Sequence, residues 1–171
     1  MAHGIIRGLT LWRPWPSVIS RLGKRIENRT RCPEWATENA TPGVLYRPAV
    51  AAPVLWLALH AGQELDREGL EILCEMTGRC PTVEDLRPDH ISAVARYAGA
   101  FTGLTAVPPD QVLWFSGPVA WDLQDLVILP EPVACTPAQD AKCFQGLWVL
   151  PPAVLDQVRE QWRRAREEIP R

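Results

Sequence analysis

The stretch LTLWRPWPSVISRLGKRIENRT, residues 9–30, decides the fold and places most of the charged residues of interest. Its first three residues predict a short strand. Pro14 suits the first turn of a helix, where its missing N–H costs nothing, and Gly23 supplies the left-handed residue that ends one. The apolar residues between them recur at i, i+3, i+4 and i+7, as on one buried helix face: Trp15, Val18, Ile19 and Leu22.

A charged strand follows the glycine. Alternation over residues 25–30 predicts that Arg25, Glu27 and Arg29 share one face. Lys24, one of only two lysines beside sixteen arginines, lies in the preceding turn, so alternation does not determine where it points. The corner can bring an ammonium, a carboxylate and a guanidinium together to bind a polar, anionic ligand. The alternative is an ion-pair network that only stabilises the fold.

The composition limits the number of domains and the kinds of ligand that we expect. With 171 residues, 47% of them hydrophobic, we expect a single domain over residues 1–171. The net charge of −2 is no nucleic-acid signature. However, Glu27 is the only acid among residues 1–31, which carry seven basic side chains: Arg7, Arg13, Arg21, Lys24, Arg25, Arg29 and Arg31. This excess either focuses phosphate toward one face or forms a solvated basic surface.

The chain lacks the features of membrane and secreted proteins. No segment approaches the roughly 20 apolar residues of a membrane span, and the N-terminus lacks a secretory signal. Five cysteines at irregular spacing predict reduced thiols and a cytoplasmic location. Their spacing does not match zinc sites, so we expect no metal, and no cofactor motif is present.

Beyond residue 30, periodicity and turn signals predict further elements. The predicted strands cover residues 43–47, 54–59, 99–107, 146–150 and one or two segments within 117–129. The predicted helices cover residues 64–77, with Leu65, Ile72, Leu73 and Met76 inward, 89–97, and 151–168. Thr82 and Asp85 have capping-box spacing. The absence of regular βα alternation favours an α+β fold, a small mixed barrel of about six strands with peripheral helices.

Four motifs occur in a characteristic order between residues 9 and 150. They are G-K-x-x-E-x-R from Gly23 to Arg29, H-A-G at 60–62, W-F-S-G-P at 114–118 followed by Trp121, and G-L-W at 146–148. Together they resemble the ASCH family, a branch of the PUA-like superfold. The helix over residues 151–168 follows this motif-matched core.

The resemblance implies a pseudo-barrel of five or six strands with a cleft beside the Gly-Lys corner. ASCH proteins are associated with RNA binding, RNA processing and transcription coactivation. Some small relatives are amidohydrolases that act on acylated cytidine and carry a threonine three residues after the motif lysine. Glu27 occupies that position here, and a carboxylate cannot act as the hydroxyl nucleophile proposed for those relatives.

The leading hypothesis is therefore a domain that binds RNA or a nucleotide, with DNA as an alternative. Lys24 and Arg29 would contact phosphate or a base edge, and Glu27 would accept a hydrogen bond from an exocyclic amine. The alternative hypothesis is a hydrolase of modified nucleosides or RNA, with Lys24 stabilising charge and Glu27 as general acid and base. The sequence leaves the oligomeric state open.

Four further residues complete the predicted site. Trp12 and Trp114 either stack on bases or pack within the fold, and Arg13 follows Trp12 next to the basic corner. His60 either lines the cleft as an acid, base or hydrogen-bond donor, or is a structural histidine.

Overall fold

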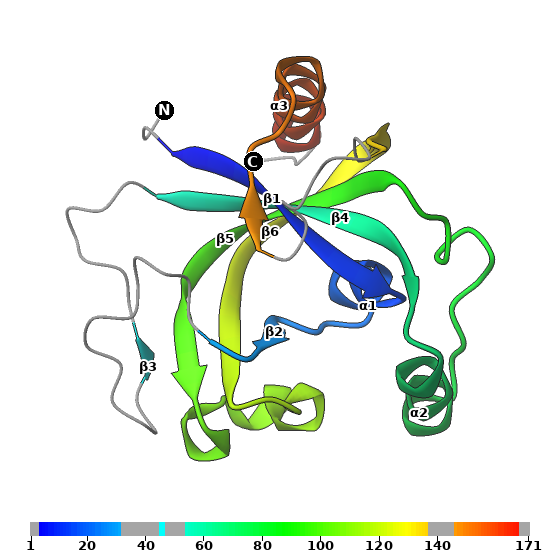
Figure 1. Cartoon of the computed structure of the whole chain (residues 1–171), viewed down its shortest axis with the longest axis vertical. Helices are drawn as coiled ribbons and strands as arrows, with labels where there is room; N and C mark the ends of the chain where they lie inside the picture. The colour runs from blue at the N-terminus through cyan, green and yellow to red at the C-terminus, as the bar shows by residue number, and fades with distance from the viewer. Residues whose placement is uncertain (1–3, 32–44, 47–53, 137–145, 168–171) are drawn as a thin grey trace.

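The computed structural model describes residues 4–31, 45–46, 54–136 and 146–167. A strongly curved β-sheet forms the body, with helices packed around it (Figure 1). The strands are β1 (Ile5–Arg13), β2 (Ile26–Arg29), β3 (Leu45–Tyr46), β4 (Leu55–Leu65), β5 (His90–Thr102), β6 (Val119–Ala134) and β7 (Leu147–Trp148). The helices are α1 (Trp15–Arg21), α2 (Arg67–Thr77) and α3 (Pro152–Glu167), with short 3-10 helices η2 (Leu104–Ala106) and η3 (Pro109–Trp114).

The sheet is mixed, with the strand order β2-β6-β5-β4-β1-β7 and β3 beside β5. β1 and β4 run parallel, and the other pairs are antiparallel. Among the described residues the hydrogen-bonded path ends at β2 and at β7 and does not close into a barrel. The predicted α+β class and mixed sheet are confirmed, whereas the predicted barrel is wrong, because the sheet stays open among the described residues.

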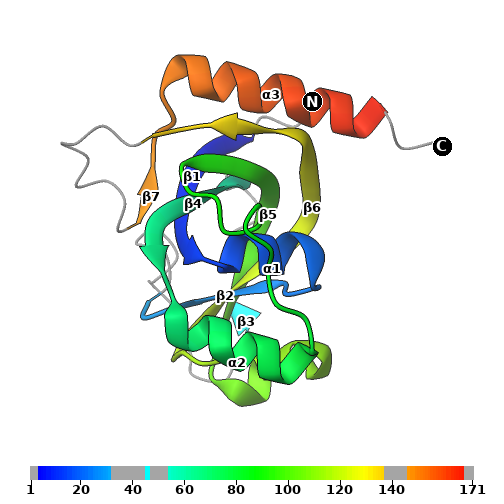
Figure 2. The same cartoon turned by 90° about the vertical axis from the view of Figure 1, so that its right-hand side faces the viewer.

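Two long strands give the sheet its curvature. β5 and β6 pair along most of their length, with three interruptions of register. Such irregularities bend and twist a strand pair, and Figure 2 shows β6 curling from α3 toward β2. The curl lets β2, at one end of the sheet, carry its charged residues close to β1.

The core has two main layers. Leu9, Leu11 and Ile19 belong to a cluster between the sheet and α1. Ile6, on the other face of β1, belongs to a second cluster that includes Val158 of α3, and α3 lies across the outside of the sheet (Figure 2). Because both faces of β1 are covered in its middle, apolar residues of this strand occur on both faces, with Ile6 on one and Leu9 and Leu11 on the other.

Several predicted elements are present. α1 follows Pro14, and Gly23 after its end has φ +79°. The short strand expected within residues 43–47 is β3, and that within 146–150 is β7. Thr82 and Asp85 form the reciprocal box, with Thr82 N–H donating to Asp85 Oδ2 (2.9 Å) and Asp85 N–H to Thr82 Oγ1 (3.3 Å).

Other predictions were wrong. The helix expected over residues 89–97 is the first part of β5. This strand is buried on both faces, and an apolar run without alternation does not distinguish such a strand from a buried helix. The strand expected over 99–107 ends at Thr102 and gives way to η2. The expectation of one or two strands within residues 117–129 is confirmed, because the single long strand β6 begins at Val119.

The region after His60 also differs from the prediction. β4 continues through His60 to Leu65, so α2 begins only at Arg67. Ile72 and Met76 are exposed, and Leu73 is the buried residue of α2. Helical periodicity identified the helix but misassigned its inward face, because α2 presents little of its surface to the sheet.

The prediction of reduced thiols was wrong for one pair. Cys74 and Cys80 form a disulfide, with Cα atoms 4.7 Å apart. The left-handed Gly78 between them reverses the chain at the end of α2. Cys135 is free and buried, whereas Cys32 and Cys143 lie outside the described residues. None of the described helices is both long and apolar enough to cross a membrane.

Candidate functional site

The candidate site begins where α1 ends. Leu22 N–H donates to Val18 O (2.9 Å) to complete the last turn, and Gly23 then redirects the chain toward β2. Gln111 of η3 holds this turn in place: its Oε1 accepts from Arg25 N–H (2.6 Å) and its Nε2 donates to Gly23 O (3.1 Å). Gln111 is 5% exposed. The sequence carried no signal for it, because it lies 86 residues beyond Arg25.

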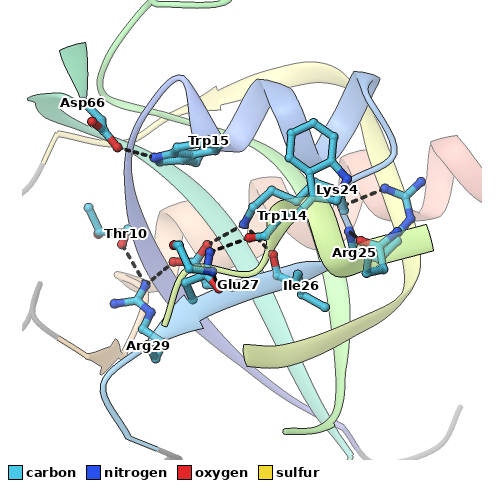
Figure 3. A network of polar contacts seen from close by, with 12 residues as sticks. Thr10, Trp15, Lys24, Arg25, Ile26, Glu27, Arg29, Asp66 and Trp114 are labelled. Atoms are coloured by element: carbon cyan, nitrogen blue, oxygen red, sulfur yellow. Dashed lines mark hydrogen bonds and ion pairs between the residues drawn. The ribbon is translucent and has the colours of Figure 1, made fainter. Parts of the chain in front are cut away.

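Lys24 points inward and is only 2% exposed. Its Nζ donates to Ile26 O (2.5 Å) and to Glu27 Oε2 (3.3 Å) and lies 5.3 Å from the centroid of the Trp15 ring (Figure 3). Burial lowers the pKa of Lys24, and the neighbouring carboxylate of Glu27 opposes that shift. The direction of this side chain, which alternation left undetermined, is thus toward the interior.

Glu27 connects two cations. Its Oε2 faces Lys24, and its Oε1 lies 3.2 Å from Nη2 of Arg29 (Figure 3). The predicted shared face of Glu27 and Arg29 is confirmed by this ion pair. Arg29 also donates to Thr10 O (3.3 Å), and its Cζ lies 5.5 Å from the ring centroid of Trp121.

The charges in this network do not cancel. At their formal charges, Lys24 and Arg29 contribute two positive charges and Glu27 contributes one negative charge. Arg29 is the member nearest to solvent, with 23% of its side chain exposed, and its buried Nε has no hydrogen-bond partner. The Lys24–Glu27–Arg29 network therefore carries a positive excess, and Arg29 is its most accessible member.

Trp15 supports the network from the side of α2. Its indole N–H donates to Asp66 Oδ2 (2.9 Å). The other oxygen of Asp66 accepts from Gly69 N–H (2.8 Å) and so caps α2. The expectation that Trp15 packs against the core is confirmed, although it is half-buried and its ring also faces the Lys24 ammonium.

Most other cations of residues 1–31 bind backbone carbonyls or an acid. Arg13 donates to Leu86 O (2.6 Å) and Gln63 O (2.5 Å). Arg25 donates to Ile19 O (2.8 Å), a carbonyl near the end of α1. Arg21 pairs with Asp85 (2.7 Å). Arg13 therefore holds β1 against the segment before β5, and its contacts are structural.

The two tryptophans predicted to stack on bases differ. Trp12 is 59% exposed near the end of β1, whereas the preceding Leu11 is buried in the core. Trp114 is half-buried against the cluster around Ile26, and its carbonyl accepts from Asn28 Nδ2 (2.8 Å). Trp12 lies where the pairing of β1 with β4 is irregular, between Leu11 and Arg13, so strand alternation does not assign it to a face.

His60 is fully buried on the outer side of β1. Its Nε2 lies 2.8 Å from Cys135 O, and since a carbonyl only accepts, this nitrogen carries the proton. Its Nδ1 then accepts from Thr10 Oγ1 (3.1 Å), which in turn accepts from Trp148 Nε1 (3.1 Å). Burial lowers the pKa of His60. These contacts match the structural interpretation of this residue.

Two comparisons with known proteins give no match. A scan against protein-family models finds no match, and a search of curated proteins finds no significantly similar sequence. Within the described part of the chain, no three His, Cys, Asp or Glu side chains gather as a metal site would require.

The chemistry offered by the Lys24–Glu27–Arg29 network is that of hydrogen-bond donors and a fixed positive charge.

Proposed function

We propose that the chain is a cytoplasmic domain of the PUA-like, ASCH type that binds RNA or a nucleotide through the Arg29 side of the Lys24–Glu27–Arg29 network. The positive excess of this network is the observation that carries the proposal. A phosphate is the natural counter-charge for a guanidinium, because two of its oxygens can accept from the same planar group.

The environment of Arg29 supports this role. Its guanidinium is held by Glu27 and Thr10 O and lies over the Trp121 ring, so little side-chain entropy remains to be lost on binding. The partial burial of the group also limits screening of its charge by water.

Lys24 and Glu27 have different roles in this proposal. Lys24 is almost wholly buried and its ammonium already has two acceptors, so it positions Glu27 and contributes charge without touching the ligand. Glu27 in turn orients Arg29. Trp12, exposed two residues beyond Thr10 on β1, is a candidate surface for a stacked base.

Fluorescence anisotropy with labelled single-stranded RNA, the same sequence as DNA, and a mononucleotide tests the proposal. We expect RNA affinity to fall with salt and to drop about tenfold in Arg29→Gln, the loss of one charge-assisted contact. Arg163→Gln is the control, because Arg163 is an exposed residue of α3 paired with Glu160. Equal affinities of wild type and Arg29→Gln, with circular dichroism showing both folded, would refute the proposal.

A hydrolase acting on a modified nucleoside is the second candidate. It is favoured by the contact of a buried amine of lowered pKa, Lys24, with a carboxylate, Glu27. Incubation with acylated cytidine and with short RNA, followed by chromatography of the products, tests it. Turnover that survives unchanged in Glu27→Gln would remove Glu27 from any such mechanism, and no turnover above buffer by wild type would leave binding as the function.

A further inference from the structure

A second surface feature lies beside α1. A surface pocket is formed between α1 and the segment that follows α2, and its lining includes Val18, Arg21, Arg79, Cys80, Pro81 and Asp85. None of its lining residues belongs to the Lys24–Glu27–Arg29 network. Figure 2 shows α2 with the chain that leaves it and rises toward β5.

The pocket carries a positive excess of its own. Asp85 is the acid in its lining, and both of its oxygens are engaged: Oδ1 by Arg21 (2.7 Å) and Oδ2 by the N–H and hydroxyl of Thr82 (both 2.9 Å). Arg79 is exposed and forms no ion pair within the described part of the chain. An anionic molecule in the pocket would therefore meet an unneutralised guanidinium.

One of the two cysteines of the disulfide lines this pocket. Cys80 is an exposed residue of the lining, whereas Cys74 is half-buried in the last turn of α2. Thiol–disulfide exchange proceeds at the sulfur that the incoming thiolate can reach. The attack is thus directed to Cys80, in a setting that favours a negatively charged thiol.

We propose that Cys80 is a site of reversible S-thiolation by a small thiol that carries carboxylate groups. The incoming thiolate bonds to Cys80 Sγ, the Cys74–Cys80 bond breaks, and its electron pair leaves on Cys74, which takes a proton from water. A second thiolate attacking the added group's sulfur returns Cys80 as a thiol and releases the small molecule as its own disulfide.

Opening this bond would loosen a segment that supports α1 and β1. Asp85 O accepts from the Ser17 hydroxyl (2.8 Å), and Leu86 O accepts from Arg13 (2.6 Å). The disulfide ties this segment to α2 at Cys80. We expect S-thiolation to raise amide hydrogen exchange in residues 79–86 while exchange in β5 and β6 stays unchanged.

The test treats the oxidised full-length chain with reduced glutathione, which carries carboxylates, and with cysteamine, which carries an ammonium. Each rate is divided by the concentration of the thiolate form of the reagent, and the adduct is located by peptide mass mapping. We expect adducts on Cys80 and a faster reaction with glutathione than with cysteamine. The ratio of the two rates should fall about fivefold in Arg79→Gln, because one charge at contact distance in water is worth about 1 kcal/mol. Arg67→Gln, an exposed arginine at the start of α2, is the matched control.

Adducts on Cys74, or a thiol preference that Arg79→Gln leaves unchanged, would overturn the proposal. A second pair of variants covers the case in which the disulfide opens too slowly to follow. Cys74→Ser leaves Cys80 as a thiol, which should react with oxidised glutathione faster than Cys74 does in Cys80→Ser. The reverse order of these two rates would equally contradict the assignment.

Discussion

Two buried polar clusters meet at the same residue of β1, and they handle burial differently. The Lys24–Glu27–Arg29 network reaches the carbonyl of Thr10 through Arg29. The neutral chain formed by Trp148, Thr10, His60 and the Cys135 carbonyl uses the hydroxyl of the same threonine.

The neutral chain of hydrogen bonds needs no further partner. Each donor in it has an acceptor and no charge is buried, so it ties β7, β1 and β4 to Cys135 just after β6 at little electrostatic cost. The charged network buries two cations against one carboxylate and retains a positive excess. A buried cluster that is not neutral by itself is the better candidate for binding a charged ligand, since burial of unpaired charge is costly.

The largest expected effect is that of Glu27→Gln. The substitution keeps the shape but leaves two cations close together without a carboxylate, and breaking a buried ion pair on one side costs about 3–5 kcal/mol. Urea unfolding should show this loss. Glu131→Gln, at an exposed acid paired with Arg164, should stay within about 0.5 kcal/mol. Similar losses in both variants would mean that the network contributes no more than a surface pair.

Thr10→Val should have the next largest effect, acting on the neutral chain alone. It preserves the shape of the side chain but removes the acceptor of Trp148 N–H and the donor to His60 Nδ1. Unsatisfied buried groups cost about 1–3 kcal/mol. Thr10→Ser keeps the hydroxyl and is the control, and a loss in Thr10→Ser equal to that in Thr10→Val would assign the effect to the methyl group.

The pH dependence of stability separates the two clusters further. Because burial lowers the pKa of His60, the unfolded chain binds its proton more readily. The contribution of this residue is fully present above the unfolded pKa of about 6.5 and is lost as pH falls below it through the lowered folded pKa.

The slope that His60 adds should be at most about 1.4 kcal/mol per pH unit, the value for one proton. Urea midpoints measured between pH 7.5 and pH 5 give this slope, which should decrease in His60→Asn. His90→Asn should change the slope much less, because the charge of His90 is the smallest of the influences on the pKa of His60. A slope unchanged in His60→Asn would show that another group titrates.

Lys24→Met should have the smallest effect. The substitution keeps the apolar stem, removes the cost of burying an ammonium and leaves Glu27 paired with Arg29. We expect a change in unfolding free energy below about 1 kcal/mol. Calorimetric melting measures it, and a loss as large as that of Glu27→Gln would contradict the positive excess inferred for the network.

Local rules predicted much of the candidate site. The strand–helix–strand order of residues 9–30 follows from Pro14, Gly23 and the apolar stripe between them, which act within one or two turns of chain. The pairing of Glu27 with Arg29 follows from strand alternation. The helix expected over residues 89–97 failed because its apolar residues are buried on both faces of β5, a fact that depends on the neighbouring strands and α3.

The sequence by itself determined which charges lie at the corner and the turn that brings them there, because those features depend on residues close together in the chain. Only the tertiary structure decided where Lys24 points and what surrounds it. Trp15 is positioned by Asp66 and the turn at Gly23 is held by Gln111, contacts that span 51 and 88 residues. Such partners are chosen by the packing of the curved sheet, and no local pattern encodes them.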